Sequence, residues 1–240
     1  MTCARLALAG HALAARPARP RATPQRIRTT RCRLLARSAA APGSSTNETP
    51  NAMPVVVAVA SGDADLRETA CIRADAYFED DSSRFRDTFR RQFAERELAR
   101  LAEQTVVPRS GGRASVTCLV ARDSSGRVVA SADVRPPRSA VPGARGRDNL
   151  APAGEEDAAF VLNVCVREDA RGRGVGAAVM RAAIDLVRAE FGSPRVYAQV
   201  DEDNTAARAL YKSLGFRVAR EASEGGRMGF DRMLLCLDLE

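Results

Sequence analysis

An apolar segment followed by a glycine-rich turn is the part of the sequence whose residue types and spacing point most directly to chemistry. Val164–Val166 is strand-like, and Arg171–Gly176 alternates arginine or valine with glycine before an amphipathic helix. Glycine lets the backbone approach a ligand closely. The first N–H groups of a helix are unpaired and carry partial positive charge, and Arg171 and Arg173 add full charge. We therefore expect this turn to bind a pyrophosphate.

Other interpretations of the turn remain open from the residues alone. It could be a solvent-exposed Arg/Gly loop or an RGG-like contact with RNA, although the apolar strand before it and the amphipathic helix after it argue against both. The run Gly172–Ala177 also satisfies the GxGxxA pattern of dinucleotide-binding folds, with Asp201 placed as the ribose-binding acid. That fold is disfavoured because residues 167–170 separate the strand from the turn, and only 39 residues follow Asp201.

The motifs resemble those of the GNAT superfamily of N-acetyltransferases. Arg171-x-x-Gly174-x-Gly176 is similar to its acetyl-CoA signature, and residues 204–216 are similar to its second signature. The resemblance covers residues 55–239 and is greatest over residues 161–216. The run Leu162–Val166 resembles the protein N-terminal acetyltransferases, above all the plastid branch of plants and algae, which acetylates protein N-termini and lysine side chains.

The resemblance implies where acetyl-CoA binds. The two amides of its pantetheine arm are spaced like peptide groups, so the arm would pair with the strand edge Val164–Val166, where the family's fold separates two parallel strands. Backbone N–H groups there would polarise the thioester carbonyl, and Asn204 would lie against the pantetheine. The residues implied to contact acetyl-CoA are Val164, Cys165, Val166, Arg171, Gly172, Arg173, Gly174, Val175, Gly176, Asn204, Thr205, Ala206 and Tyr211.

Tyr211 is the expected catalytic residue. A buried phenol could donate a proton to the departing CoA thiolate, since the two groups ordinarily have pKa values of about 10 and about 8.5. The alternative is that Tyr211 is only a core aromatic residue of a short helix. Cys165 invites a covalent acetyl-enzyme hypothesis, but the sequence offers no activator for its thiol, so we expect it to be a packing residue.

The base that would deprotonate the amine is not evident. Gln199 stands where related bacterial N-terminal acetyltransferases have a glutamate, and glutamine cannot accept a proton. Asp201, Glu202 and the run Glu155–Asp157 could act through water or attract a cationic amine. Each is equally explained as a solvated charge.

Composition excludes several kinds of site. Residues 1–50 hold nine arginines and one acid, so the other 190 residues are nearly neutral although the chain carries +7, and we expect no nucleic-acid partner. The only histidine is His11, so the rest of the chain cannot carry Ser-His-Asp hydrolysis or a histidine zinc site. No Cys-x-x-Cys pair occurs, and we expect no metal. Small buried thiols are expected at Cys71, Cys118, Cys165 and Cys236.

Residues 1–50 are expected to be an organelle transit peptide, because their Ala, Arg, Pro, Ser and Thr content cannot bury a core. The Pro and Ser/Thr content favours the chloroplast stroma, and the arginine content leaves the mitochondrion as the alternative. A disordered basic tail touching nucleic acid is a further alternative. Residues 51–240 are predicted to form a single acetyltransferase domain, with no membrane span because no run approaches 18 apolar residues, and to be monomeric.

The apolar pattern predicts a strand, two helices, three strands, a helix, a strand, a helix and two strands. The predicted strands are 54–60, 114–121, 128–134, 159–166, 196–200, 216–219 and 228–239, and the helices are 64–78, 84–104, 174–191 and 204–214. In the second helix Phe85, Phe89, Phe93 and Leu98 are predicted to face inward. Residues 136–157 contain four prolines and are expected to be a mobile loop. The fold class implied by the resemblance is α/β (α+β), a mixed, mostly antiparallel sheet with a splayed parallel strand pair and helices on both faces.

The sequence thus predicts an acetyl-CoA-dependent N-acetyltransferase that moves the acetyl group directly to a primary amine. The expected acceptors are protein N-terminal α-amines or lysine ε-amines. One alternative is a small amine such as a polyamine, and another is a non-catalytic acetyl-CoA-binding regulatory module. Judged only from their positions in the sequence, residues 136–157 and 221–226 are expected to border the acceptor.

Overall fold

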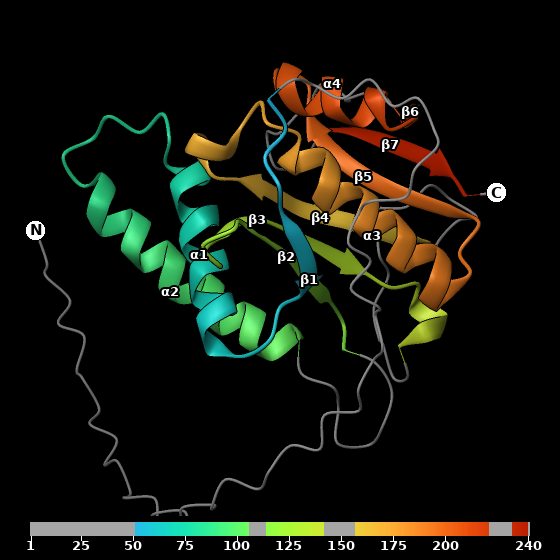
Figure 1. The fold of residues 1–240 in the computed structure, drawn as a ribbon, viewed down its shortest axis with the longest axis horizontal. Helices are drawn as coiled ribbons and strands as arrows, with labels where there is room; N and C mark the ends of the chain where they lie inside the picture. The colour runs from blue at the N-terminus through green and yellow to red at the C-terminus, as the bar shows by residue number, and fades with distance from the viewer. Residues whose placement is uncertain (1–50, 106–113, 142–156, 221–231, 240) are drawn as a thin grey trace, which may run out of the picture. The chain divides into compact units, whose positions relative to one another are not determined.

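The fold is built around a seven-stranded sheet. The computed structural model describes residues 51–105, 114–141, 157–220 and 232–239. The strand order is β1-β2-β3-β4-β5-β7-β6, and neighbours are antiparallel except β4 and β5, which are parallel (Figure 1). The strands are β1 (Val56–Val59), β2 (Thr117–Arg122), β3 (Val128–Arg135), β4 (Ala159–Val166), β5 (Arg195–Asp201), β6 (Arg217–Arg220) and β7 (Arg232–Asp238). The helices are α1 (Asp63–Tyr77), α2 (Arg86–Gln104), α3 (Val175–Phe191) and α4 (Thr205–Ser213).

Helices cover both faces of the sheet. Successive side chains of a strand point to opposite faces. On β2, Leu119 and Ala121 belong to the hydrophobic cluster of α3, whereas Cys118 and Val120 belong to that of α1 and α2. Tyr211 of α4 joins the α3 cluster. The predicted fold class, with its parallel pair and its helices on both faces, is confirmed.

The elements that carry the predicted site match the sequence pattern best. β4 has the predicted bounds, and α3 has the predicted buried face, with Met180, Ile184 and Val187 in the core. A left-handed glycine lies at each end of α3: Gly174 has φ +77° and Gly192 has φ +56°. Glycine adopts this conformation without the steric cost that other residues incur, so the two positions set the length of the helix.

The predicted inward face of α2 is confirmed at Leu98, which is half-buried against the cluster of α1 and α2, and is wrong at Phe85 and Phe89. Phe85 and Phe89 are 49% and 47% exposed, and the buried residues of α2 are Glu97 and Leu101. Phe93 stacks on Tyr77 of α1 at 4.8 Å between ring centroids. The helical period placed the phenylalanines on one face correctly, but the N-terminal half of α2 packs against the end of α1 instead of the sheet.

Two further expectations meet a mixed outcome. Cys118 and Cys236 are buried and Cys165 is half-buried, but Cys71 is exposed, because it lies on the side of α1 turned away from the sheet. In the predicted loop, Arg138–Ala140 forms a 3-10 turn, and the Ser139 N–H donates to Asp157 at 2.8 Å. Residues 142–156 of that loop, which include Glu155 and Glu156, lie outside the described residues, as do residues 1–50 and 221–231. Among the described helices, none combines the length and apolar character that crossing a membrane requires.

Candidate active site

The parallel strands β4 and β5 separate after a short shared ladder. Their pairing is limited to Ala159–Val161 with Val196–Ala198. β5 remains paired with β7 along its whole length, and β4 remains paired with β3 up to Val166. From Leu162 to Val166, β4 therefore has no ladder partner on its β5 side within the described strands. A splayed strand edge with unpaired backbone groups results.

A bulge in β4 lies at the start of this splay. Asp133 pairs with Leu162 and Ser131 pairs with Cys165, so two residues of β4 oppose a single residue of β3. Asn163 lies in the bulge with φ +51°, the one positive φ among the described non-glycine residues. A bulge redirects the backbone groups beside it. The N–H groups at the mouth of the splay are therefore oriented by residues 163 and 164.

The glycine turn (residues 171–176) joins the end of β4 to α3. Gly172 and Gly174 have φ values of +69° and +77°, and a Cβ atom on either would meet nothing within 4 Å. Their role is conformational, and the space above them is open. The first intrahelical bond of α3 runs from the Ala178 N–H to the Gly174 carbonyl, and no side chain caps the helix. The N–H groups of residues 175–177 are left without helical acceptors, which favours an anion there.

Gly176 has a different role, which is close packing. A Cβ atom there would lie 3.2 Å from Leu210 Cδ2 and 3.5 Å from Val166 Cγ2. The first turn of α3 therefore lies directly against both α4 and the free end of β4. This contact brings the two predicted motifs, which are separated in the sequence, to the same place.

The side chain of Arg171 in the glycine turn is already engaged. Arg171 donates from its two terminal nitrogens to Glu79 at 2.6 and 2.8 Å and from Nε to the Val166 carbonyl at 3.1 Å. The Glu79 carboxylate raises the pKa of Arg171, and Arg171 lowers the pKa of Glu79. The Arg173 carbonyl accepts from the Met53 N–H at 3.0 Å. A phosphate that binds the turn would therefore compete with Glu79 for Arg171.

Tyr211 reaches the splay from the face covered by α3. It is 5% exposed, and its ring meets Phe216 edge-on at 5.4 Å between centroids. Burial, with a smaller contribution from Cys165, raises the pKa of Tyr211 to about 12. Burial also raises the pKa of Cys165. At neutral pH the phenol can therefore donate a proton, whereas the Cys165 thiol has little thiolate with which to form an acetyl-enzyme.

The other predicted residues lie at the start of α4 and on β5. Asn204 caps α4, with its Oδ1 accepting from the Ala207 N–H at 3.0 Å, and Thr205 and Ala206 are exposed at the start of that helix. Gln199 is half-buried on β5, and Asp201 accepts from Arg232 at 2.9 Å. None of these contacts supplies a base: glutamine has no proton-accepting carboxylate, and Asp201 is held by a cation.

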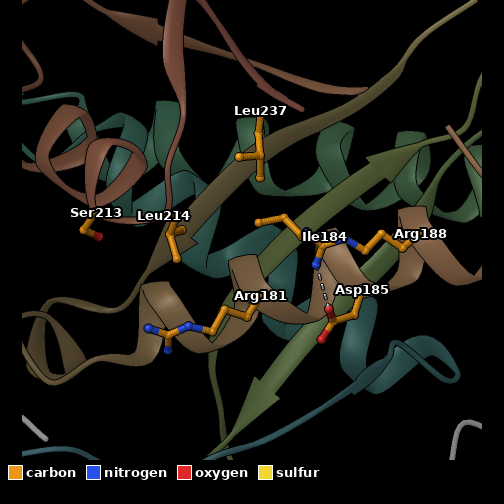
Figure 2. Close-up of a pocket in the computed structure, with 7 residues that line it drawn as sticks. All are labelled: Arg181, Ile184, Asp185, Arg188, Ser213, Leu214 and Leu237. Carbon is orange, nitrogen blue, oxygen red and sulfur yellow. Dashed lines mark ion pairs between the residues drawn. The ribbon is translucent and has the colours of Figure 1, made fainter. Parts of the chain in front are cut away.

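Two hollows lie near these elements. One, of about 590 Å³, adjoins Arg171 and the end of β4 and is lined by Ile72, Asp75, Ala76, Glu79, Arg86, Val166, Arg167, Glu168, Asp169 and Arg171. The other, of about 380 Å³, lies between α3 and the end of α4 (Figure 2). Its lining combines the apolar Ile184, Leu214 and Leu237 with Ser213, Arg181 and the Arg188–Asp185 ion pair at 3.6 Å. The first of these hollows contains two predicted site residues, Val166 and Arg171, and the second contains none.

Sequence reasoning missed Asn163 and the charged residues behind it, Arg73, Glu97, Arg100 and Asp133. Their signal was faint but present. Asp133 is an acid within a largely apolar strand, and Asn163 interrupts the apolar run of β4.

No group of His, Cys, Asp and Glu residues that could hold a metal occurs in the described ranges.

Residues 74–216 match the model of the acetyltransferase (GNAT) family. A chloroplastic GCN5-related N-acetyltransferase of Arabidopsis thaliana is 27% identical over 167 residues, 62% of this chain and 57% of that protein. A mycothiol acetyltransferase of Renibacterium salmoninarum is 42% identical over 68 residues, 28% of this chain and 20% of that protein. The chain therefore matches 57% or less of the length of these two relatives.

Solved structures share the fold. A Corynebacterium glutamicum protein described as histone acetyltransferase HPA2 and related acetyltransferase has a TM-score of 0.57 at 21% identity, covering 78% of this chain and 98% of that chain. A GCN5-related N-acetyltransferase of Kribbella flavida has a TM-score of 0.50 at 26% identity, covering 77% of this chain and 98% of that chain.

Proposed function

The chain belongs to the GNAT acetyltransferase family, and from that premise we propose that it transfers an acetyl group from acetyl-CoA to a primary amine of a protein. The observation that carries this proposal is the meeting of three features at one place. These are the free edge of β4, the open glycine turn and the buried Tyr211.

The residues around the splay fit acetyl-CoA. The edge Val164–Val166, which has no ladder partner on its β5 side within the described strands, offers backbone groups of the kind that the pantetheine amides require, although the Val166 carbonyl already accepts from Arg171. The unpaired N–H groups of residues 175–177, with open space above Gly172 and Gly174, suit a pyrophosphate. Thr205 and Ala206 would flank the arm, as would the amide nitrogen of Asn204, since its oxygen is used as a cap.

Acetyl-CoA supplies an activated acyl carbon as its thioester. The backbone N–H groups of the β4 bulge would stabilise the negative charge that develops on the thioester oxygen when the amine nitrogen attacks. As the C–N bond forms and the C–S bond breaks, Tyr211 would give its phenolic proton to the leaving sulfur. The amine loses a proton to water or to a base that the described residues do not identify.

A protein acceptor is favoured by the run Leu162–Val166, which resembles the protein N-terminal acetyltransferases. The resemblance to that plastid branch supports both protein N-termini and lysine side chains as acceptors. The chloroplastic relative from Arabidopsis and the basic composition of residues 1–50 support a chloroplast location, with residues 1–50 as the transit peptide. We further propose that residues 51–240 form one domain and that the mature protein is monomeric.

A small amine is the second candidate acceptor, because two mycothiol acetyltransferases match short segments of the chain at 42% and 43% identity. These matches span 28% and 32% of the chain. A segment of that length can carry the acetyl-CoA motifs without the acceptor site. A third candidate, of another class, is a non-catalytic acetyl-CoA-binding module.

One experiment separates these functions. Protein beginning at Asn51 is incubated with acetyl-CoA and a pool of N-terminal peptides, internal-lysine peptides and polyamines, and the products are identified by mass spectrometry. Acetylated peptides are expected, and the α to ε ratio defines the acceptor. Acetylated polyamine alone would establish the small-amine function. CoA binding without any product would establish the binding module.

A fusion of residues 1–50 to a fluorescent protein tests the location, with a diffuse cytosolic signal refuting it.

A further inference from the structure

Two helices and the sheet enclose a cluster of four charged residues directly behind the β4 bulge. Asp133, Arg73 and Glu97 are 0%, 5% and 9% exposed. Arg73 donates to both Asp133 oxygens at 2.7 and 2.9 Å and to Glu97 at 2.7 Å. Arg100 binds Glu97 at 2.5 and 2.8 Å. The cluster contains two acids and two bases, so it is neutral as a whole.

Among the described residues of β4, Asn163 is the one whose side chain bonds to the cluster. The Asn163 side-chain nitrogen donates to Asp133 Oδ2 at 2.8 Å, although Asn163 itself is exposed. The same residue has φ +51°, a conformation that asparagine tolerates better than most residues. A rigid buried anion therefore holds the side chain of the residue that shapes the bulge.

Neither acid of the cluster is suited to remove a proton from the amine. Asp133 accepts two bonds from Arg73 and one from Asn163, so its oxygens are occupied. Although burial opposes it, bonds from Arg100 and Arg73 lower the pKa of Glu97. A buried ion pair is also weak as a source of stability, since apolar side chains of similar volume often serve as well. Its position behind the splay suggests another purpose.

We propose that Asn163 is a positioning residue, clamped by the Arg73–Asp133–Glu97 cluster so that the β4 bulge aims its backbone N–H groups at the thioester carbonyl. This inference rests on the proposed function. It adds that α1 and α2, which lie on the opposite face from α3, control the geometry of the reacting carbonyl. Asp133 acts through Asn163 and makes no contact with substrate.

The test measures the carbonyl directly and needs no acceptor amine. Acetyl-CoA labelled with 13C at the carbonyl is bound to the protein, and its C=O stretch is recorded by difference infrared spectroscopy. Hydrogen bonds from the bulge should lower the stretching frequency in the wild type relative to free acetyl-CoA. Asn163→Ala, which loses the clamp and disfavours the positive φ, should lose most of this shift. Asn163→Gly, which loses the clamp but permits the φ, should retain an intermediate shift.

Kinetics and binding provide the second readout. Asn163→Ala should lower kcat by about tenfold to about a hundredfold, the scale expected for misplacing a reacting group by about 1 Å. Its affinity for CoA, by calorimetry, and its Tm should stay close to those of the wild type. The control Arg188→Ala, which removes an exposed ion pair on α3, should change neither kcat nor the spectrum.

Equal carbonyl frequencies in the wild type and Asn163→Ala would overturn the inference, whether or not any amine is acetylated. If no amine is acetylated but the carbonyl frequencies of the wild type and Asn163→Ala differ as expected, the result would count against the proposed function alone. Asp133→Asn, which weakens the clamp but keeps the asparagine that tolerates the positive φ, should reproduce the intermediate spectrum of Asn163→Gly if it folds. The exposed Asn163 variants carry the test if it does not.

Discussion

Replacing Tyr211 by phenylalanine removes one buried hydroxyl and keeps the ring that contacts Phe216. With the pKa of Tyr211 at about 12 and an ordinary thiol pKa of about 8.5, full proton transfer to the thiolate is uphill by about 5 kcal/mol, at about 1.4 kcal/mol per pKa unit. The same buried environment raises the thiol pKa as well and narrows this gap. We therefore expect a loss near the lower end of the usual range for a general acid, about a hundredfold in kcat.

The assay compares kcat for the wild type and Tyr211→Phe, with the Kd for CoA measured by calorimetry. The Kd should change by less than about threefold, because the ring still fills its place in the core. A variant with wild-type kcat would refute the acid role of Tyr211. A variant that loses affinity and rate together would indicate that the hydroxyl contributes to binding instead.

The raised pKa has its own consequence with a definite sign. Tyr211 in the unfolded chain loses its proton near its ordinary pKa of about 10, and in the folded protein near about 12. Between these values the unfolded state binds fewer protons, so the free energy of unfolding falls by about 3 kcal/mol as the pH rises. Urea titrations of the wild type from pH 9 to 11.5 should show about 2 kcal/mol of this fall, and the corresponding titrations of Tyr211→Phe should lack it. A tyrosine-dependent fall in kcat near pH 10 would refute the argument from burial.

Three other changes test the neighbouring groups. Gly174→Ala should raise the Kd for CoA about tenfold or more by calorimetry, because φ +77° disfavours a side chain. The matched control is Gly126→Ala in the β2–β3 turn, where φ is +85° and a Cβ atom would have equally free space, and it should leave the Kd unchanged. Glu79→Gln should lower the KM for acetyl-CoA severalfold at low salt by releasing Arg171, and an unchanged KM would mean that Arg171 does not reach phosphate. Gln199→Glu should flatten the rise of kcat/KM with pH below the pKa of the amine, and an identical pH profile would argue that this position does not face the acceptor.

The sequence predicts an element correctly where the signals that determine it lie within the segment itself. β4 and α3 were predicted closely because an apolar run and a helical period of buried residues, ended by glycines, are signals contained in the segments themselves. Gly174 could be identified as special for the same reason. The period of Phe85 and Phe89 was also correct, but a period states only that residues share a face. Tertiary packing decides whether another part of the protein covers that face, and nothing among the described residues covers Phe85 and Phe89 fully.

Pairings between distant segments could not be predicted. Arg171 binds Glu79, 92 residues away, and Arg73 binds Asp133, 60 residues away. A charged residue in a single sequence is most often a solvated one, so neither pair carries a local signal. The bulge at Asn163 was hidden for a related reason, since a bulge is a mismatch between two strands and belongs to neither alone. The residues that refine the site were therefore those least visible in the sequence.

The splay of β4, its bulge and the start of α3 share one physical property, which is backbone groups without partners in the regular elements. The splay leaves β4 backbone groups without a ladder, the bulge turns some of them outward, and the left-handed Gly174 starts a helix whose first N–H groups lack acceptors. Folded proteins satisfy nearly all buried backbone donors and acceptors, so such a concentration calls for a partner from outside the chain. A ligand with amides at one end and a pyrophosphate at the other satisfies all three at once. On the proposed function, backbone geometry would provide most of the specificity for acetyl-CoA. Gly174 would act through its backbone conformation, and the side chains of Asn163 and Tyr211 would hold or complete that geometry.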